Sequence, residues 1–566
     1  MSSAPGLTSS LRHRDFRLLM GAFVTSTVGS WAYNVALTVW IFQETHSAGW
    51  VGAATIGRFL PALLFSAYGG VVAERFERFR LMATLDVVSG AVMVLLAVET
   101  ALHAPVALAI VTAAVTSVIG TVYEPAVAAS TPQLVGERDL GSANALRNTI
   151  DNAVVIAGPG LGAVLLLLGP PSIAIAVNAV SYFVSAVMVL RIRARSRPVD
   201  VTEGGELGAF RQMLVGAKSI TSSSTAAVLV AYSVVATFVF GVDTVLLVVL
   251  SRDVLGTGAE GYGYLLAGLG TGGVLAAGAV ARLERLPRLG FVILAGMAIY
   301  CLPTLLFLFV SSPAVAFVIE AVRGAGTLVV DVLAISALQR SLQSDVLARV
   351  FGAFNAFVLA AVLVGASVAP PVLDNLGLEP TLWLAGAALP AVCLLGWPAL
   401  RRMDAQAAER MAALRPRVDL LAACDLFAAV SEGALEQLAG AAQEVTVAPG
   451  EAVVTEGEPA DAFFVVVSGA MSVTARAGRA APVALRELEP GDYFGEIGLI
   501  EGIARTATVT AAEPSQVLRI AGDEFIAALT ESSPSAALLE GASMRLRHSH
   551  PTLTLTQAGL GESDGR

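Results

Sequence analysis

The chain has 566 residues, of which 55% are hydrophobic and only 14% are charged, and its mean hydropathy is +0.74. That composition excludes a soluble protein of ordinary type, and a formal net charge of −10 gives no reason to expect a nucleic-acid partner. The three cysteines have neither disulfide nor metal-ligand spacing, so no metal cofactor is expected.

Apolar segments long enough to cross a membrane fill the part of the chain before residue 401. A hydrocarbon core of about 30 Å requires roughly 20 apolar residues in helical form. We predict twelve spans, at residues 16–42, 48–73, 81–102, 105–128, 148–168, 172–190, 225–250, 261–283, 289–311, 313–336, 350–376 and 380–400. The predicted domains of this all-α membrane part are an N-terminal six-helix bundle (1–190), a cytoplasmic connector (191–224) and a C-terminal six-helix bundle (225–400).

Basic residues gather in the loops on one side of these spans. The segments LRHRDFR before the first span, ERFERFR after the second and RIRARSR after the sixth all lie on that side. The positive-inside rule assigns that side to the cytoplasm. We therefore expect a multi-pass protein of the bacterial cytoplasmic membrane, surrounded by lipid, with both termini in the cytoplasm.

The loop GGVVAERFERFR, at 69–80, resembles the signature of the major facilitator superfamily between its second and third spans. The positions that match and that we assign to a conformational latch are Gly70, Glu74, Arg75 and Arg78. Glu77 stands where the family usually has a second Gly. An acid here can face a helix N-terminus or an Arg across the seam between the two bundles, which would hold one conformer until the contact breaks. A plain positive-inside loop is the alternative.

The segment AGPGLGAVL is similar to the GPxxG element of the superfamily's exporters, with Gly158, Pro159 and Gly162 in place. Ordinary close helix packing explains these residues nearly as well. Residues 10–400 as a whole are similar to the branch that contains macrolide and siderophore exporters. That resemblance implies two bundles that rock around a midplane site and move a small-molecule substrate outward.

Ionisable and polar residues at membrane depth are costly, so they are candidates for the transport path. They are Asn34, Arg58, Asp243, Glu320 and Arg323. Glu320 and Arg323 are three residues apart on one helix face and can neutralise each other. Asp243 has no local partner, which makes it the preferred acid for proton coupling. A structural pair of Asp243 with Arg58 is the alternative.

The composition changes at about residue 401, where short alternating strands and Gly-centred turns replace the apolar runs. Residues 418–530, including the segment YFGEIGLIEGIARTATVTA, closely resemble the cyclic-nucleotide-binding domain of catabolite activators, cyclic-nucleotide kinases and gated channels. The resemblance implies an antiparallel β-roll with flanking helices. We predict a linker helix at 401–417, this domain at 418–548 and a disordered tail at 549–566.

The phosphate cassette of that family corresponds to residues 494–509. The resemblance assigns Glu496 to the ribose 2′ hydroxyl and Arg505 to the cyclic phosphate, and both are present; Ala504 replaces the usual Pro. The predicted nucleotide-binding residues are Phe494, Gly495, Glu496, Ile497, Arg505, Thr506 and Ala507, and the predicted lid over the base is Leu529, Leu538 or Leu539. We expect cAMP, with cGMP as the alternative ligand. A nucleotide-free domain used for docking is the other interpretation.

These features predict a secondary exporter regulated by a cyclic nucleotide, and a homodimer is one expected arrangement. The alternatives are a membrane-anchored sensor without transport and a transporter of the cyclic nucleotide itself. An enzyme is not expected, because the sequence has no GKS/T phosphate loop, no catalytic-triad pattern and no metal-ligand cluster.

Overall fold

The computed structural model describes the backbone of residues 9–196, 206–258, 261–283, 286, 288–341, 344–428, 430–475 and 483–531. The chain forms two compact units, one of residues Pro5–Ala405 and one made mainly of the residues from Gln406 onward. Each unit is described by itself.

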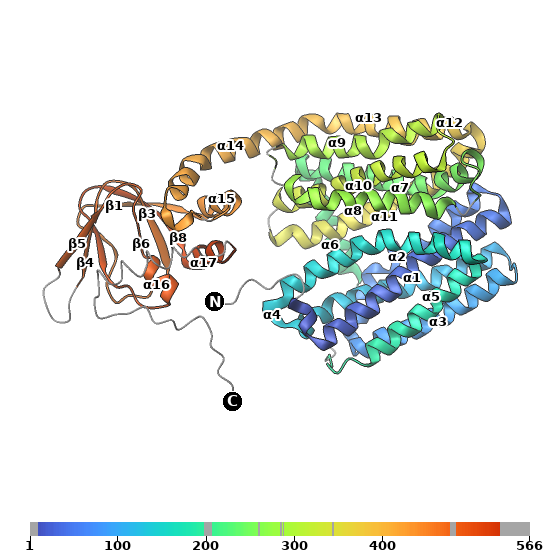
Figure 1. The fold of residues 1–566 in the computed structure, drawn as a ribbon, viewed down its shortest axis with the longest axis horizontal. Coiled ribbons are helices and arrows are strands. Elements are labelled where there is room, and N and C mark those ends of the chain that lie inside the picture. The colour runs from blue at the N-terminus through green and yellow to red at the C-terminus, as the bar shows by residue number, and fades with distance from the viewer. Residues whose placement is uncertain are drawn as a thin grey trace. The chain divides into compact units, whose positions relative to one another are not determined.

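The first half of the first unit is a group of long helices. A 3-10 helix, η1 (Ser9–Arg12), precedes α1 (Arg14–Thr45), α2 (Ala48–Arg75), α3 (Arg78–Ala101), α4 (Val106–Leu168) and α5 (Pro171–Leu190). Figure 1 shows these helices side by side. The predicted fourth and fifth spans both lie on α4, which is broken at Gly136, where φ is 73° and the backbone leaves the helical region.

The second half of this unit is a second group of helices. It comprises α6 (Glu206–Ser222), α7 (Ser224–Val249) with the π-helical turn η2 (Leu250–Val254), α8 (Gly261–Leu283), α9 (Leu289–Cys301) with the 3-10 helix η3 (Leu302–Leu308), α10 (Pro313–Ser341) and α11 (Ser344–Leu376). The last apolar segment is α12 (Leu378–Trp383), η4 (Leu384–Ala388), α13 (Leu389–Cys393), η5 (Leu394–Gly396) and the start of α14 (Trp397–Ala422).

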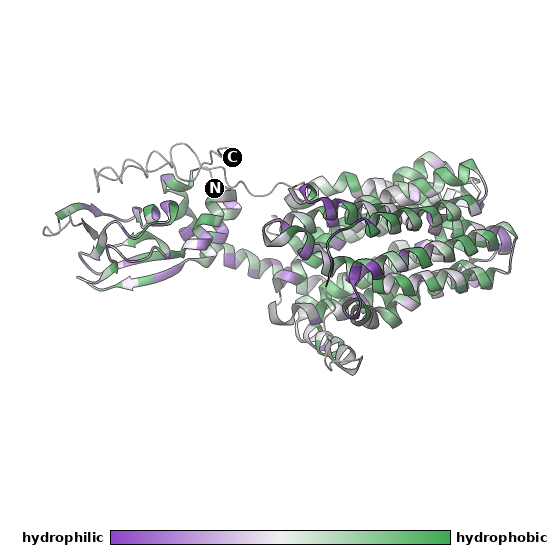
Figure 2. Cartoon of the chain, turned by 90° about the horizontal axis from the view of Figure 1, so that it is seen from below, coloured by the Kyte–Doolittle hydropathy of each residue, from purple (hydrophilic) through white to green (hydrophobic). Residues whose placement is uncertain are grey.

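Every predicted span falls on a helical segment, which confirms the all-α membrane domain. Within the described residues, nine helices are long and apolar enough to cross a membrane. The count of twelve spans stays a prediction. Apolar residues cover most of the length of the helices in Figure 2, and Leu167, Phe309 and Leu395 are each more than four-fifths exposed. Such exposure of large apolar side chains is costly in water and ordinary in lipid.

The two helix groups pack against each other through α2 with α11 and α4 with α8. Gly52, near the start of α2, faces Ala366 and Pro370 of α11, and a Cβ built on it would lie 2.6 Å from the Ala366 carbonyl oxygen. Gly263, at the start of α8, faces Ala163 of α4 in the same way, at 2.9 Å between Cβ positions. Glycine therefore permits close contact between the halves at the end of the bundle where α2 and α8 begin.

Helices α8 and α10 approach each other to backbone contact. A Cβ on Gly272 would overlap the carbonyl oxygen of Ala321, and a Cβ on Gly324 would overlap the carbonyl oxygen of Leu269. One helix turn away, a Cβ on Gly268 would lie 3.2 Å from the Cβ of Glu320. Glycines about one turn apart on α8 allow the backbones of α8 and α10 to touch, as is common between membrane helices.

Substituting Gly272→Ala is expected to lower the melting temperature of the purified chain, because the helices must separate to admit the methyl group. Overpacking of this kind costs about 1–3 kcal/mol. Gly278→Ala is the matched control, since it lies on the same helix and its Cβ would meet no described atom within 4 Å. Equal melting temperatures for the two variants in detergent would show that the α8–α10 contact is not tight.

The second unit contains a two-sheet β-roll with helices beside it. After the end of α14 come η6 (Asp425–Phe427), α15 (Glu432–Ala441), β1 (Gln443–Val447), β2 (Ala452–Val454), β3 (Ala462–Ser468), β4 (Met471–Ala475), β5 (Val483–Leu488), β6 (Tyr493–Phe494), α16 (Glu496–Glu501), β7 (Thr508–Ala511), β8 (Ser515–Ala521) and α17 (Gly522–Glu531). The sheets have the orders β1-β8-β3-β6 and β2-β7-β4-β5, and all pairs are antiparallel. The predicted β-roll with flanking helices is confirmed.

Strand β3 divides the interior of this unit in two, because successive side chains of a strand point to opposite faces. Phe463 stacks on Phe525 of α17, with ring centroids 4.5 Å apart, in the cluster beneath the helices. Phe464 stacks on Phe494, at 5.0 Å, in the cluster inside the roll. The roll and the helices are therefore held by the two faces of one strand.

Candidate functional site

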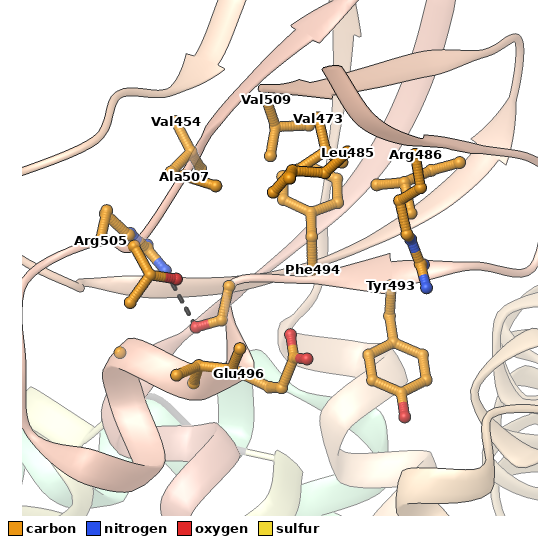
Figure 3. Close-up of a pocket in the computed structure, with 15 residues that line it drawn as sticks. Val454, Val473, Leu485, Arg486, Tyr493, Phe494, Glu496, Arg505, Ala507 and Val509 are labelled. Carbon is orange, nitrogen blue, oxygen red and sulfur yellow. Dashed lines mark hydrogen bonds between the residues drawn. The ribbon is translucent and has the colours of Figure 1, made fainter. Parts of the chain in front are cut away.

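A pocket of about 460 Å³ opens in the β-roll. This volume lies within the range of roughly 300–1,000 Å³ that is typical of small-molecule sites. Its lining residues are Val454, Val473, Leu485, Arg486, Leu488, Tyr493, Phe494, Gly495, Glu496, Ile497, Gly498, Arg505, Thr506, Ala507 and Val509. All seven predicted nucleotide-binding residues line this pocket. Figure 3 shows Arg505 and Glu496 across the space from Val473, Leu485 and Val509, so the pocket has a polar side and an apolar side.

Gly495 connects β6 to α16 in a conformation that favours glycine. Its φ is 90°, in the left-handed region. A Cβ at this position would lie 2.7 Å from Nη1 of Arg505 and 3.0 Å from the carbonyl oxygen of Ala462. Both the backbone and the space therefore require glycine where the chain passes Arg505.

The side chain of Arg505 is 4% exposed, and its guanidinium donates hydrogen bonds to three acceptors. Nη1 donates to the carbonyl oxygen of Gly495 at 3.0 Å, as the dashed line in Figure 3 shows. Nη2 donates to the carbonyl oxygen of Ala462 at 2.8 Å and to Oδ1 of Asp461 at 3.0 Å. Its carbon Cζ lies 5.8 Å from the ring centroid of Phe464. The site therefore presents a fixed positive charge, which suits an anionic ligand.

Asp461 connects Arg505 to a second arginine. Its Oδ2 accepts from Nη2 of Arg519 at 2.8 Å, while Oδ1 accepts from Arg505. Partial burial opposes ionisation of Asp461, but the hydrogen bonds from the two arginines outweigh it and hold the pKa of this carboxyl below its ordinary value. Asp461 is thus ionised at neutral pH. Sequence reasoning missed it because it precedes β3, far along the chain from the cassette.

Glu496 is 4% exposed and begins α16. Figure 3 shows its carboxylate on the same side of the pocket as the Arg505 guanidinium. A buried carboxylate that lines the same pocket as a buried guanidinium can accept a hydroxyl hydrogen bond while the guanidinium binds an anion. The arrangement suits a ligand that carries both groups close together, as the resemblance implies.

The lid residues fall in two places. Leu529, on α17, is 4% exposed and packs in the cluster that contains Phe525. It does not line the pocket in this structure. Leu538 and Leu539 lie outside the described residues. A lid role for these leucines stays a prediction.

In the membrane unit, the structure brings together three of the five predicted transport residues. Arg323 donates from Nη1 to Oε1 of Glu320 at 2.6 Å and from Nη2 to Oδ2 of Asp243 at 2.5 Å. Asp243 has no partner close in sequence, as expected, but it pairs with Arg323 on α10, and the alternative pairing with Arg58 is wrong. The correction has a simple cause: the planar guanidinium has two nitrogens to offer, and packing of α7 on α10 brings Asp243 to the one that Glu320 leaves free.

The other two predicted transport residues lie apart from this cluster. The guanidinium of Arg58 lies over the rings of Trp31 and Phe59, with Cζ 5.2 Å and 5.0 Å from their centroids. These are cation–π contacts. Asn34 donates from Nδ2 to the carbonyl oxygen of Ser30, one turn back on α1.

In the predicted latch, Arg78 is buried and donates from Nη1 to the carbonyl oxygen of Ala129 at 3.1 Å, within the N-terminal half. Arg75 is exposed. Gly70 and Glu74 lie on α2, but their side chains are outside what the structure describes. The acid at a helix N-terminus is Glu77, which accepts from the backbone N–H groups of residues 79 and 80 and caps α3. The acid directly before a helical run was the signal that could have found it.

The GPxxG element packs α4 closely against α1. A Cβ on Gly158 would overlap Cβ of Trp31, and a Cβ on Gly162 would lie 2.8 Å from the carbonyl oxygen of Ala32. The close-packing explanation of this element therefore accounts for its glycines.

Comparison with known proteins finds two successive family matches along the chain. Residues 6–424 match the transmembrane secretion effector family, a family of major facilitator transporters, and residues 444–532 match the cyclic nucleotide-binding domain. The second region is 45% identical over 89 residues to a cAMP-dependent protein kinase regulatory subunit of Yarrowia lipolytica, which covers 16% of this chain and 23% of that protein. It is 38% identical over 94 residues to the acetyltransferase Pat of Mycolicibacterium smegmatis, which covers 17% of this chain and 28% of the relative.

Solved structures also match part of the chain. The sensor domain of the transcriptional regulator DNR from Pseudomonas aeruginosa is 26% identical and covers 25% of this chain and 95% of that one, with a TM-score of 0.23. The chain spans less than a third of the length of the curated relatives named above. Because one family match extends over residues 6–424, the chain belongs to the transmembrane secretion effector family, and it carries a cyclic nucleotide-binding domain at residues 444–532.

Proposed function

We propose that this chain is a secondary exporter of small molecules whose transport is regulated by cAMP bound in the β-roll pocket. The observation that carries the proposal is that Glu496 and Arg505, both almost fully buried, line one pocket of suitable volume together with the five other predicted binding residues. Relatives of this region include a cAMP-dependent kinase subunit. The positive-inside rule supports a pocket on the cytoplasmic side, where the messenger is made.

The membrane unit supports transport over a purely anchoring role. An anchor needs no buried ions, yet Asp243, Glu320 and Arg323 form a cluster with side-chain exposures of 0–3%. Such groups are costly at membrane depth and mark functional paths. The close contact of the two halves where α2 and α8 begin, at the predicted outer end, suits a carrier closed to the outside. The substrate then enters from the cytoplasm when the halves separate at the other end.

Regulation requires that cAMP change the balance between conformers of the membrane unit. Spin labels at Leu102, after α3, and Leu376, at the end of α11, stand on different halves at exposed positions. We expect cAMP to shift the distance distribution between them, because a coupling of about 1–3 kcal/mol changes conformer populations roughly 5- to 150-fold. Pulsed electron–electron double resonance measures the distance distribution between the two labels, and it requires no knowledge of the substrate.

The same labels in an Arg505→Ala background are the control for that measurement. If calorimetry shows that the labelled chain binds cAMP and the label-to-label distances are the same with and without cAMP, the nucleotide does not regulate the membrane unit. Uptake of labelled cAMP into proteoliposomes tests the remaining alternative, in which the nucleotide is the cargo.

A further inference from the structure

The charged cluster between α7, α9 and α10 contains one more acid than it has bases. Arg323 is fully buried and donates to Glu320, to Asp243 and, from Nε, to the carbonyl oxygen of Tyr300 at 3.0 Å. Side-chain exposure is 0% for Glu320 and 3% for Asp243. Oδ1 of Asp243 and Oε2 of Glu320 are both buried without a hydrogen-bond partner among the described residues.

The groups that face this cluster offer no second positive charge within the described part of the chain. They are Tyr262 from α8, Tyr300 and Cys301 from α9, and Arg323 itself from α10. Arg58, which interacts electrostatically with Tyr262, lies over aromatic rings on α1 and α2. If both carboxyls were ionised, the cluster would carry an uncompensated negative charge in a site closed to water, which proteins avoid by protonation. We propose that the cluster binds one exchangeable proton and that Glu320, not Asp243, holds it.

The hydrogen bonds decide between the two acids. Oδ2 of Asp243 accepts two, from Arg323 and from the hydroxyl of Tyr300 at 3.2 Å. Among the residues that the structure describes, Glu320 accepts one, from Arg323. Donors aimed at a carboxylate favour its ionised form, so Asp243 is the fixed anion that balances Arg323. The proton lies on Oε2 of Glu320, the oxygen turned away from the guanidinium.

The position of Glu320 suits a proton that is released only when helices move. It faces Gly268 on α8, where the two helices are in backbone contact, so no water reaches it in this conformer. Separation of α8 from α10 would open this side of Glu320. The inference rests on the transport part of the proposed function, names the proton as the coupling ion, and revises the expectation that Asp243 carries it.

Infrared spectroscopy on the full-length chain in lipid nanodiscs tests the assignment. Cell-free synthesis supplies wild type and Glu320→Gln with the side-chain carboxyl carbon of either Glu or Asp labelled with ¹³C. The difference between wild type and Glu320→Gln at pH 7 should show the carbonyl band of a protonated acid, and this band should shift in the Glu-labelled samples only. A band that shifts with labelled Asp, or no band at all, overturns the proposal.

A second variant keeps the test decisive. An amide is isosteric with a protonated acid, so Glu320→Gln should melt within a few degrees of wild type. In Asp243→Asn, Glu320 becomes the only counter-ion of Arg323 and should ionise, so its band should vanish although the residue is present. If the band persists in Asp243→Asn, Glu320 stays protonated even without Asp243, and the proposal that the two acids compete for the one positive charge of Arg323 is wrong. Because the spectra need neither substrate nor nucleotide, failure here and failure of cAMP regulation are separate results.

Discussion

We expect Arg505→Ala to lower the affinity of the full-length chain for cAMP by about 10- to 150-fold in a calorimetric titration. A hydrogen bond to a charged group contributes about 1.5–3 kcal/mol, and each 1.4 kcal/mol corresponds to about tenfold in affinity. The loss is this large because Arg505 is the lining residue that presents a buried positive charge on the polar side of the pocket, opposite Val473 and Val509. Alanine leaves the phosphate of the ligand without that partner.

Arg519→Ala is the matched control for this measurement. Arg519 binds the same carboxylate, Asp461, at 2.8 Å, but it does not line the pocket. Both variants lose an ion pair with Asp461, so any effect of that ion pair on the affinity for cAMP should appear in both. Loss of a contact with the ligand should lower the affinity of Arg505→Ala alone. Similar affinities in the two variants would mean that Arg505 acts only by holding Asp461, the partner that both arginines share. Melting curves of both proteins without ligand verify that each is folded.

Arg323→Ala is expected to destabilise the membrane unit more strongly than Gly272→Ala does. It removes the guanidinium that Asp243 and Glu320 share and leaves Asp243 buried without its counter-charge. Breaking a buried ion pair by removing one partner costs about 3–5 kcal/mol. Denaturant unfolding of the purified chain in detergent, followed by the fluorescence of its tryptophans, measures the loss.

Arg252→Ala serves as the comparison for that result. Arg252 is 44% exposed in η2, which follows α7, and its Nε lies 3.7 Å from Oδ1 of Asp253, which is also accessible. An exposed pair of this kind contributes about 0–1 kcal/mol. Should both arginine variants unfold at the same denaturant concentration, the Asp243–Arg323–Glu320 cluster would contribute no more than a surface pair.

The residues of the pocket that could be predicted are those close together in sequence. Phe494 to Ala507 form one strand end, one short helix and one loop, and the resemblance to the cyclic-nucleotide-binding family identified this continuous segment as the phosphate cassette. Asp461, which holds Arg505 from outside the pocket lining, meets Arg519 through the antiparallel pairing of β3 with β8. A pairing between segments so far apart along the chain depends on the whole sheet, and no local pattern reports it.

In the membrane unit, too, the contacts between residues close in sequence could be predicted and those between distant residues could not. Hydropathy located the helices, and three-residue spacing predicted the contact of Glu320 with Arg323. The contact of Asp243 with Arg323 joins residues 80 positions apart and is set by helix packing, which hydropathy does not encode. The break at Gly136 lies between the predicted fourth and fifth spans, but hydropathy did not indicate which residue would interrupt the helix.

The three acceptors around Arg505 affect how a ligand binds as well as where. A free arginine side chain has many rotamers, and fixing it on association would subtract about 0.5–1.5 kcal/mol from the affinity. Here Gly495, Ala462 and Asp461 already immobilise the guanidinium before any ligand arrives. Its conformational entropy is lost during folding, so the domain meets its ligand as a rigid receptor, and mutations that free this side chain should weaken binding even where they touch no ligand atom.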